Sequence, residues 1–361
     1  MLIETSSMDA CQTRCNYWQT GELLLKNKKP IKAENPMNLN DASLRLPSAS
    51  PARDHRESFK ETAADGHLIG GFTWRHIRTD PTRPVVIINA ATSVRCRHYA
   101  RFADYLFAHG VDVITYDYRG IGESRSGSLR GFKASWSDWG ALDFEAMLKR
   151  AQREFPGQPI DVVGHSFGGC AAGLGASGAV IRRMVTVGAQ FAYWRDYAAS
   201  GRWRMFAKWH VAMPLLTALC GYFPGKRLGW LEDTPAGVVR DWSTPTPSYE
   251  TRPSGRTLGE LPFSRVKAQI LAISITDDPF GTVAAIERLL GYFDGSELTH
   301  LRIAPEDIGE KTVGHFAFFR SEYQDRLWPI ALAWLQNGQL AADTLGISLN
   351  LRFNTPSRSE T

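Results

Sequence analysis

The sequence has few cysteines, and they follow no regular pattern. There are five in 361 residues, an odd number at irregular spacings: Cys11, Cys15, Cys96, Cys170 and Cys220. Secreted disulfide-rich proteins show an even number at characteristic spacings. Three residues separate Cys11 from Cys15, and no second pair of Cys or His lies nearby, which argues against a zinc site. We therefore expect reduced thiols, a cytoplasmic location, and neither a metal nor a cofactor.

A strong charge of either sign is also absent. Lys and Arg number 42 and Asp and Glu 37, which gives a formal net charge of +5. The densest basic run, at 26–32, is flanked by Glu22 and Glu34. Nucleic-acid binding requires basic residues clustered on one face. The sequence therefore predicts a mildly basic, solvated surface and no nucleic-acid partner.

No apolar run is long enough to cross a membrane. The longest outside the expected strands, at 211–223, covers 13 residues, whereas a spanning helix needs about 20. The N-terminus, Met-Leu-Ile-Glu-Thr-Ser-Ser, has no basic start followed by an apolar stretch, so it does not resemble a secretory signal. We expect no stable membrane insertion. A buried lid helix is the favoured interpretation of 211–223, and a surface that contacts lipid is the alternative.

What is present is an ordinary globular composition, with 43% hydrophobic and 22% charged residues. Short apolar runs alternate with helical patterns, which predicts a mostly parallel sheet with helices on both faces. We expect strands at 84–89, 111–116, 160–163, 184–187, 270–275 and 298–303, and helices at 99–109, 135–155, 167–178, 283–292 and 321–334. Asp65-Gly66 predicts a hairpin before them.

The alternation also divides the chain into parts. Polar, weakly patterned residues 1–56 predict a flexible extension, and 339–361 a C-terminal tail. Residues 57–190 and 264–338 form the predicted α/β core. Between them, 191–263 holds five of the chain's 11 tryptophans. An insertion of this length between two strands is typical of a cap or lid over a site.

A candidate nucleophile lies in Gly164-His165-Ser166-Phe167-Gly168, directly after one expected strand and before a helix rich in small residues. In this context G-x-S-x-G predicts a sharp turn that exposes Ser166. The backbone at such a turn is strained, and side chains at 164 or 168 would collide with it, which explains the two glycines. An ordinary glycine-rich turn with an uninvolved serine is the alternative.

The base and the acid are expected in the order Ser, then Asp or Glu, then His. Three histidines follow Ser166, namely His210, His300 and His315. His210 falls in the insertion and His300 within an expected strand, whereas His315 lies in a loop before the last helix. Asp277 and Asp278 both follow the strand at 270–275. We prefer Asp278 by its spacing, and Asp277 remains the alternative acid.

An oxyanion hole requires two backbone N–H donors. The first is expected from Phe167, directly after the nucleophile. The second is expected from Ala91 or Thr92, in the loop after the strand at 84–89. Small residues in that loop suit a backbone that approaches the substrate closely.

With these parts in place, residues 59–336 resemble the α/β-hydrolase superfamily, and more narrowly its serine-aminopeptidase-like predicted hydrolases. The motifs that carry the resemblance are Asp-Tyr-Arg-Gly-Ile-Gly-Glu-Ser at 117–124, Pro-Gly-Lys-Arg-Leu-Gly at 224–229 and Gly-His-Phe-Ala-Phe-Phe at 314–319. The resemblance implies an eight-stranded sheet with a cap after the sixth strand. Many relatives have His-Gly where this chain has Asn89-Ala90.

These observations predict a serine hydrolase that cleaves an ester, or less readily an amide or peptide, through an acyl-enzyme at Ser166. Acyl transfer by the same residues is one alternative. A ligand-binding protein that keeps the fold without turnover is another. The aromatic insertion favours a small-molecule substrate with an apolar acyl group. The sequence leaves the exact substrate and the oligomeric state open.

Overall fold

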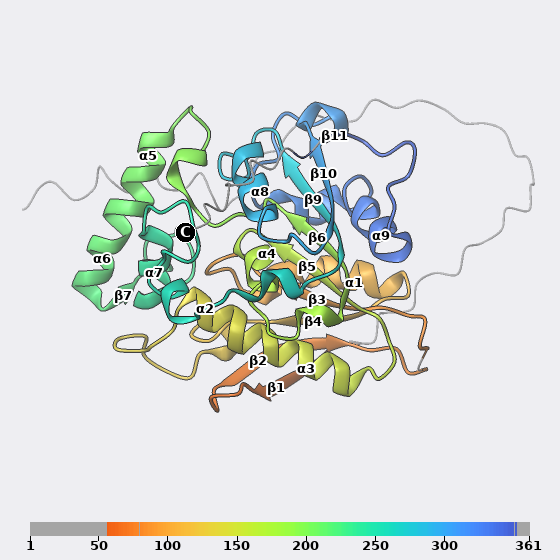
Figure 1. Cartoon of the computed structure of the whole chain (residues 1–361), viewed down its shortest axis with the longest axis horizontal. Coiled ribbons are helices and arrows are strands. Elements are labelled where there is room, and N and C mark those ends of the chain that lie inside the picture. The colour runs from red at the N-terminus through yellow and green to blue at the C-terminus, as the bar shows by residue number, and fades with distance from the viewer. Residues whose placement is uncertain (1–55, 79, 350, 352–361) are drawn as a thin grey trace, which may run out of the picture. The chain divides into compact units, whose positions relative to one another are not determined.

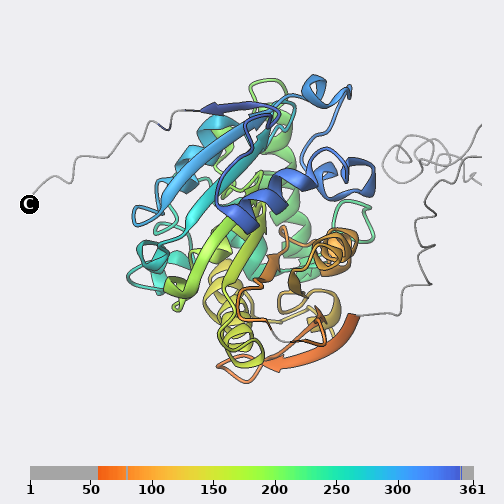
Figure 2. The same ribbon diagram turned by 90° about the vertical axis from the view of Figure 1, so that its right-hand side faces the viewer.

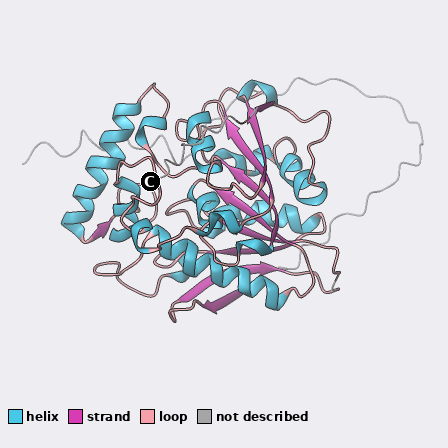
Figure 3. Cartoon of the chain, viewed as in Figure 1, coloured by secondary structure: helices cyan, strands magenta, loops and turns pink. Residues whose placement is uncertain are grey.

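The computed structural model describes residues 56–78, 80–349 and 351, and its central element is a nine-stranded sheet (Figure 1; Figure 3). The strand order is β1-β2-β4-β3-β5-β6-β9-β10-β11. The bounds are β1 Arg56–Thr62, β2 Leu68–Trp74, β3 Val85–Asn89, β4 Asp112–Tyr116, β5 Ile160–His165, β6 Ile181–Val187, β9 Gln269–Ile275, β10 Glu297–Ile303 and β11 Ile347–Leu349. The predicted extension at 1–56 lies outside the described residues, apart from Arg56, which begins β1.

The sheet is mostly parallel, as predicted. Neighbouring strands from β4 to β10 pair in parallel, whereas β1 with β2, β2 with β4, and β10 with β11 pair antiparallel. Every residue of β3, β4 and β5 is buried. Because successive side chains of a strand point to opposite faces, both faces of the sheet must be covered.

The prediction of eight strands was wrong by one. The ninth strand, β11, lies in the segment expected to be a C-terminal tail and pairs with β10 through His300, Leu301 and Arg302. It has only three residues, and the first two are exposed. A strand this short at the edge of a sheet has too little alternation to be recognised in a sequence.

Helices cover the faces of the sheet. Those outside the insertion are α1 Ala100–Ala108, α2 Trp136–Asp138, the π-helical η4 Trp139–Phe144, α3 Glu145–Glu154, α4 Phe167–Ala172, α8 Val283–Leu290 and α9 Trp328–Asn337. The rings of Phe102 in α1 and Trp328 in α9 lie 5.3 Å apart, so these helices pack together, and both face the viewer in Figure 2. Pro329 lies in the first turn of α9, where its missing N–H removes no helical hydrogen bond, so it does not kink the helix.

We call residues 191–263 the inserted segment. Its main elements are α5 Arg202–Phe206, the π-helical η7 Ala207–Ala212, α6 Met213–Cys220, β7 Tyr222–Phe223, β8 Thr234–Pro235 and α7 Ala236–Ser243. β7 and β8 form a separate two-stranded sheet. The remaining short 3₁₀ turns are η2 Cys96–Tyr99, η3 Gly122–Ser124, η5 Gly178–Val180, η6 Trp194–Asp196, η8 Gly255–Thr257, η9 Pro262–Arg265, η10 Pro305–Ile308, η11 Ala317–Phe319 and η12 Ser321–Tyr323.

Buried His300 makes the stability of the fold depend on pH. Its Nε2 lies 2.8 Å from the Ser274 hydroxyl, and burial lowers the pKa of His300 from 6.5 to about 4. Between these pH values the unfolded chain binds a proton that the folded chain does not. We therefore expect the free energy of unfolding to fall as the pH decreases from about 6.5 to about 4. Urea unfolding across this range should show a smaller fall for His300→Asn, and an identical fall would contradict the assignment.

Candidate active site

Ser166 occupies a strained turn between β5 and α4. Its backbone angles are φ 53° and ψ −123°, a conformation that residues other than glycine rarely adopt. The Ser166 N–H donates to the Val187 carbonyl at 2.9 Å, which ties the turn to the end of β6. A Cβ at Gly164 would lie 2.6 Å from Gly169 Cα, and one at Gly168 would lie 2.2 Å from the Asn89 carbonyl oxygen. Only glycine at these two positions lets the chain turn this sharply.

His315 is paired with Asp278. The Nδ1 atom of His315 lies 2.7 Å from Oδ2 of Asp278, and the side chains are 6% and 2% exposed. The other carboxylate oxygen of Asp278 accepts the Phe280 N–H at 2.8 Å. The carboxylate is thus held at both oxygens, and it accepts a hydrogen bond from Nδ1. Nε2 is then left as the basic atom.

Asp277, the alternative acid, has a different set of partners. Its carboxylate is exposed and accepts the N–H groups of Val313 at 2.9 Å and Gly314 at 2.8 Å. These residues immediately precede His315, and Gly314 has φ +67°, in the left-handed region that favours glycine. Asp277 therefore anchors the loop that carries His315, while Asp278 contacts the imidazole itself.

Several contacts bring the Ser166 turn and His315 to the same edge of the sheet. The ring of His165 lies 5.1 Å from that of His315, and His165 Nε2 lies 2.9 Å from the His315 carbonyl oxygen. A Cβ added to Gly188, the residue after β6, would lie 3.1 Å from His315 Nδ1 and 2.9 Å from Asp278 Oδ2. His165 ends β5, Gly188 follows β6, Asp278 follows β9 and His315 follows β10, so these residues lie at the carboxyl ends of parallel strands, where open α/β sheets bind their ligands.

Within the described part of the chain, no hydrogen bond joins the Ser166 hydroxyl to His315. Ser166 is 8% exposed and His315 9%. Catalytic hydrogen bonds are often long or poorly aligned before substrate binds. Ser166 and His315 thus lie at the same edge of the sheet, and the hydrogen bond between them is not formed in this structure.

The loop after β3 is connected to the backbone of His315 by a chain of hydrogen bonds through Tyr99 and His165. The Ala91 N–H donates to the Tyr99 hydroxyl at 2.9 Å, and this hydroxyl lies 2.8 Å from His165 Nδ1. Because His165 Nε2 faces a carbonyl oxygen, it carries the proton, so Tyr99 donates to Nδ1. Burial keeps the pKa of His165 well below its usual range, so the ring is neutral.

This connection distinguishes the two candidates for the second oxyanion donor. The Ala91 N–H is already used by Tyr99. Among the residues that the structure describes, the N–H groups of Thr92 and Phe167 have no hydrogen-bond acceptor. Thr92 and Phe167 are therefore the pair of candidates with free donors.

Tyr99 was not identified from the sequence, since a tyrosine in an expected helix gives no signal of such a role. Its side chain is fully buried. We expect Tyr99→Phe to lower the free energy of unfolding by about 1–3 kcal/mol, because it leaves a buried donor and a buried acceptor unpaired. Urea denaturation measures this, with Tyr105→Phe, a half-buried tyrosine in α1, as the matched control. Equal stability of the two variants would contradict the connection.

Aromatic side chains of the core and the inserted segment enclose the site. The ring of Phe167 stacks on that of Trp136 at 4.8 Å, and Trp209 stacks on Trp242 at 4.8 Å. Phe280 lies 4.9 Å from the His315 ring and 6.2 Å from Trp209. The groups around Ser166 and His315 are thus largely apolar, and some of them come from the inserted segment.

The other histidines after Ser166 lie elsewhere. His300 contacts Ser274 inside the sheet, and His210 Nδ1 lies 2.9 Å from the Ser243 carbonyl oxygen within the inserted segment. In the described residues no three His, Cys, Asp or Glu side chains are grouped as metal ligands.

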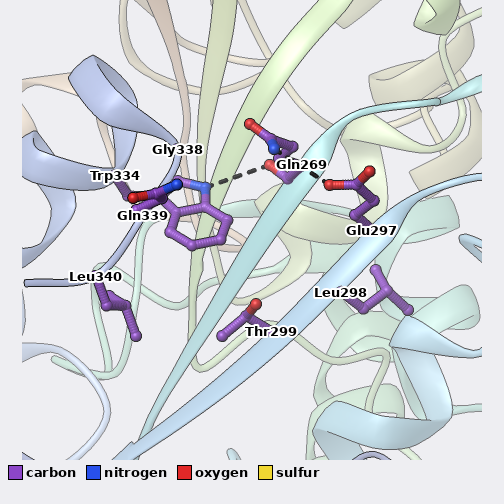
Figure 4. A pocket seen from close by; sticks show the side chains of 8 residues that line it. All are labelled: Gln269, Glu297, Leu298, Thr299, Trp334, Gly338, Gln339 and Leu340. Atoms are coloured by element: carbon purple, nitrogen blue, oxygen red, sulfur yellow. Dashed lines mark hydrogen bonds between the residues drawn. The ribbon is translucent and has the colours of Figure 1, made fainter.

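A pocket of about 460 Å³ lies at the opposite edge of the sheet (Figure 4). Gln269 and Glu297 on its wall are the first residues of β9 and β10, and the Trp334 indole N–H donates to the Gln269 carbonyl at 3.3 Å. It is lined by Gln269, Glu297, Leu298, Thr299, Trp334, Gly338, Gln339 and Leu340. None of these is a candidate nucleophile or base, so the pocket has no part in the chemistry considered below.

Comparison with known proteins agrees with this fold. Residues 80–235 match the family model described as serine aminopeptidase, S33. The match includes Ser166 and the loop after β3 but ends before Asp278 and His315. No curated protein sequence matches the chain.

Solved structures with a similar fold share little sequence. Puromycin hydrolase aligns with 18% identity and a TM-score of 0.50, over 84% of this chain and 43% of that one. An esterase from Pyrococcus furiosus aligns with 16% identity and a TM-score of 0.49, over 81% of this chain and 96% of that one. An esterase domain from a Rhodothermus marinus protein has 12% identity, a TM-score of 0.48 and coverages of 78% and 98%. Together with the mostly parallel sheet, the family match confirms the α/β-hydrolase fold and the resemblance to its serine-aminopeptidase-like members.

Proposed function

We propose that this protein hydrolyses carboxylic esters of small molecules through an acyl-enzyme on Ser166. The observation that carries the proposal is a serine in a strained strand-to-helix turn, next to a histidine whose Nδ1 lies 2.7 Å from a buried carboxylate. Amides and peptides are less favoured substrates. The aromatic surroundings of the site favour an apolar acyl group.

In the proposed reaction, His315 Nε2 takes the proton of the Ser166 hydroxyl as the oxygen attacks the ester carbonyl. The imidazolium that forms is stabilised by Asp278 at Nδ1. The carbonyl oxygen becomes an oxyanion and accepts the N–H groups of Phe167 and Thr92. When the tetrahedral intermediate collapses, the bond between the acyl carbon and the alkoxy oxygen breaks, and His315 gives its proton to that oxygen, so that the alcohol leaves. Water then attacks the acyl-enzyme while His315 takes its proton. The bond to the Ser166 oxygen breaks, the carboxylic acid leaves, and the proton returns to Ser166.

We assign the role of a cap to the inserted segment. Trp209 of this segment packs against Phe280, which contacts the His315 ring. Ser166 is almost fully covered. A substrate would therefore reach the hydroxyl along the inner face of the inserted segment.

A test uses p-nitrophenyl esters with acyl chains of two to twelve carbons. We expect a burst of p-nitrophenol equal to the enzyme concentration and, after acid quench, a mass increase of one acyl group on the peptide containing Ser166. Added alcohols would reveal acyl transfer as a second product. Turnover with no acylated peptide, or binding of intact ester without turnover, would contradict the proposal.

A further inference from the structure

The inserted segment presents an unpartnered apolar helix face. α5, η7 and α6 follow one another without a break from Arg202 to Cys220, and Figure 1 shows α5 and α6 along the outer edge of the inserted segment, with α7 on their inner side. Met205, Trp209, Met213 and Thr217 are buried, at 8%, 6%, 0% and 7% exposure. The residues two positions away from these along the chain point outward, and we call the large apolar ones the outer row. They are Trp203 at 70%, Val211 at 44%, Leu215 at 61% and Leu219 at 79% exposure.

The π-helical turn η7 explains why residues spaced four apart remain on the same side of this long helix. In an α-helix, residues four apart are displaced by about 40° around the axis at each step. η7 has a wider turn, which reverses part of this displacement in the middle of the helix. Both rows therefore keep their direction. The expectation of a buried lid helix at 211–223 was wrong for the outer row, because a helix that is apolar on all sides does not reveal which side is covered.

Single exposed apolar residues are common on protein surfaces. Four large ones on one side of a helix, with only Ala207 between Trp203 and Val211 on that side, form a patch, and such patches mark contact surfaces. Trp203 adds an indole, a group that favours the boundary between water and lipid.

The charged residues within the helix and the turn that follows it have one sign. From Tyr197 to Leu231 the chain has no Asp or Glu, and it carries five basic residues: Arg202, Arg204, Lys208, Lys226 and Arg227. Among the described residues none of the five forms an ion pair with a carboxylate. Lys208 instead lies over the rings of Trp209 and Trp230, at 4.4 and 4.2 Å. The segment therefore offers unpaired positive charge beside its apolar row.

We propose that the outer face of the helix Arg202–Cys220 docks on an anionic lipid surface. An apolar helix face with basic residues beside it suits the boundary between headgroups and acyl chains, where both kinds of group are satisfied. A second copy of this chain fits less well, because a symmetric contact would bring the two basic segments together. Among the described helices none has the length and hydropathy of a membrane span.

The inner side of the same helix connects this surface to the site. Trp209 stacks on Trp242 and packs against Phe280, next to the His315 ring. If the outer row of this helix lies in lipid, the aromatic residues that cover the site lie close to the membrane boundary. Esters dissolved in the lipid would then be the substrates closest to Ser166. This last step rests on the proposed function, whereas docking itself does not.

The test is sedimentation of the full-length protein with vesicles of phosphatidylcholine alone or mixed with phosphatidylglycerol. We expect binding to the mixed vesicles, weakened by 0.5 M NaCl, and little binding to the neutral ones. Leu215→Glu/Leu219→Glu should reduce binding at least about tenfold. Ile77→Glu/Ile347→Glu, which alters two isoleucines that are 101% and 68% exposed elsewhere, should bind like the wild type.

Two further variants separate charge from apolar contact and docking from chemistry. Arg204→Gln/Lys226→Gln should weaken binding about fivefold per residue, whereas Lys267→Gln, outside the segment, should not. Ser166→Ala should bind vesicles unchanged, so a failure of the hydrolase proposal leaves this result intact. Circular dichroism melting curves confirm that each variant is folded.

The proposal is overturned if the folded protein does not sediment with mixed vesicles, or if the two glutamate pairs behave alike. It is also overturned if light scattering shows a dimer that Leu215→Glu/Leu219→Glu dissociates, which would make a second copy the occupant. A photo-crosslinker at position 215 that attaches to residues 1–55 of the same chain would overturn it in favour of that segment.

Discussion

Replacing Asp278 with asparagine is expected to lower kcat toward p-nitrophenyl esters about 10⁴-fold with little change in KM. The substitution keeps the size of the side chain and removes its charge. The amide NH₂ can donate to Nδ1 of His315, which would favour the tautomer with its proton on Nε2, the wrong nitrogen for a base. The imidazolium would also lose the carboxylate now 2.7 Å away.

Asp277→Asn is the matched control, since it makes the same chemical change one residue earlier. Asp277 accepts the N–H groups of Val313 and Gly314 and does not contact the imidazole. An asparagine retains one oxygen acceptor for these donors. We expect a loss in kcat of no more than about tenfold, since a loosened loop affects position and not tautomer. A larger loss for Asp277→Asn than for Asp278→Asn would assign the acid to Asp277.

Removing the side chain of Ser166 or His315 is expected to have the largest effect. Ser166→Ala and His315→Ala should each lower kcat by about 10⁴-fold or more, and the double variant should lose no more than either single one. The effects on kcat are not additive when two groups act as a unit, because neither group can act without the other. Steady-state rates on one ester, with residual wild-type contamination excluded by titration, measure this.

Additive losses would mean that Ser166 and His315 act independently, and the proposed proton transfer between them would then be wrong. His210→Ala is the control for removing a histidine. It lies in the inserted segment and contacts the Ser243 carbonyl. Its removal should leave kcat within a few-fold of the wild type.

Much of this candidate site could be predicted from the sequence, because local steric and burial requirements restrict which residue types can occur. The collision of any side chain at 164 or 168 with nearby backbone requires glycine there, and the requirement is visible as G-x-S-x-G. The buried strands β3, β4 and β5 appear as continuous apolar runs because both faces of the sheet are covered.

Other features depend on directions in space that no local pattern records. Asp277 and Asp278 follow the same strand, and only the path of the turn determines which carboxylate faces His315. Tyr99 joins the loop at Ala91 to His165 by hydrogen bonds, and no sequence pattern predicts that these three residues meet. The outer row of the helix at 202–220 is as apolar as the inner one. In each case the residue type was compatible with two arrangements, and tertiary contacts selected one.

The most direct test of the central claim is covalent labelling with a fluorophosphonate probe, followed by mass spectrometry of the digested protein. We predict a single modified residue, Ser166, with a rate that falls strongly in His315→Ala although the serine is still present. No labelling of the folded wild-type protein, or modification at another serine that persists in Ser166→Ala, would contradict a hydrolase built on Ser166.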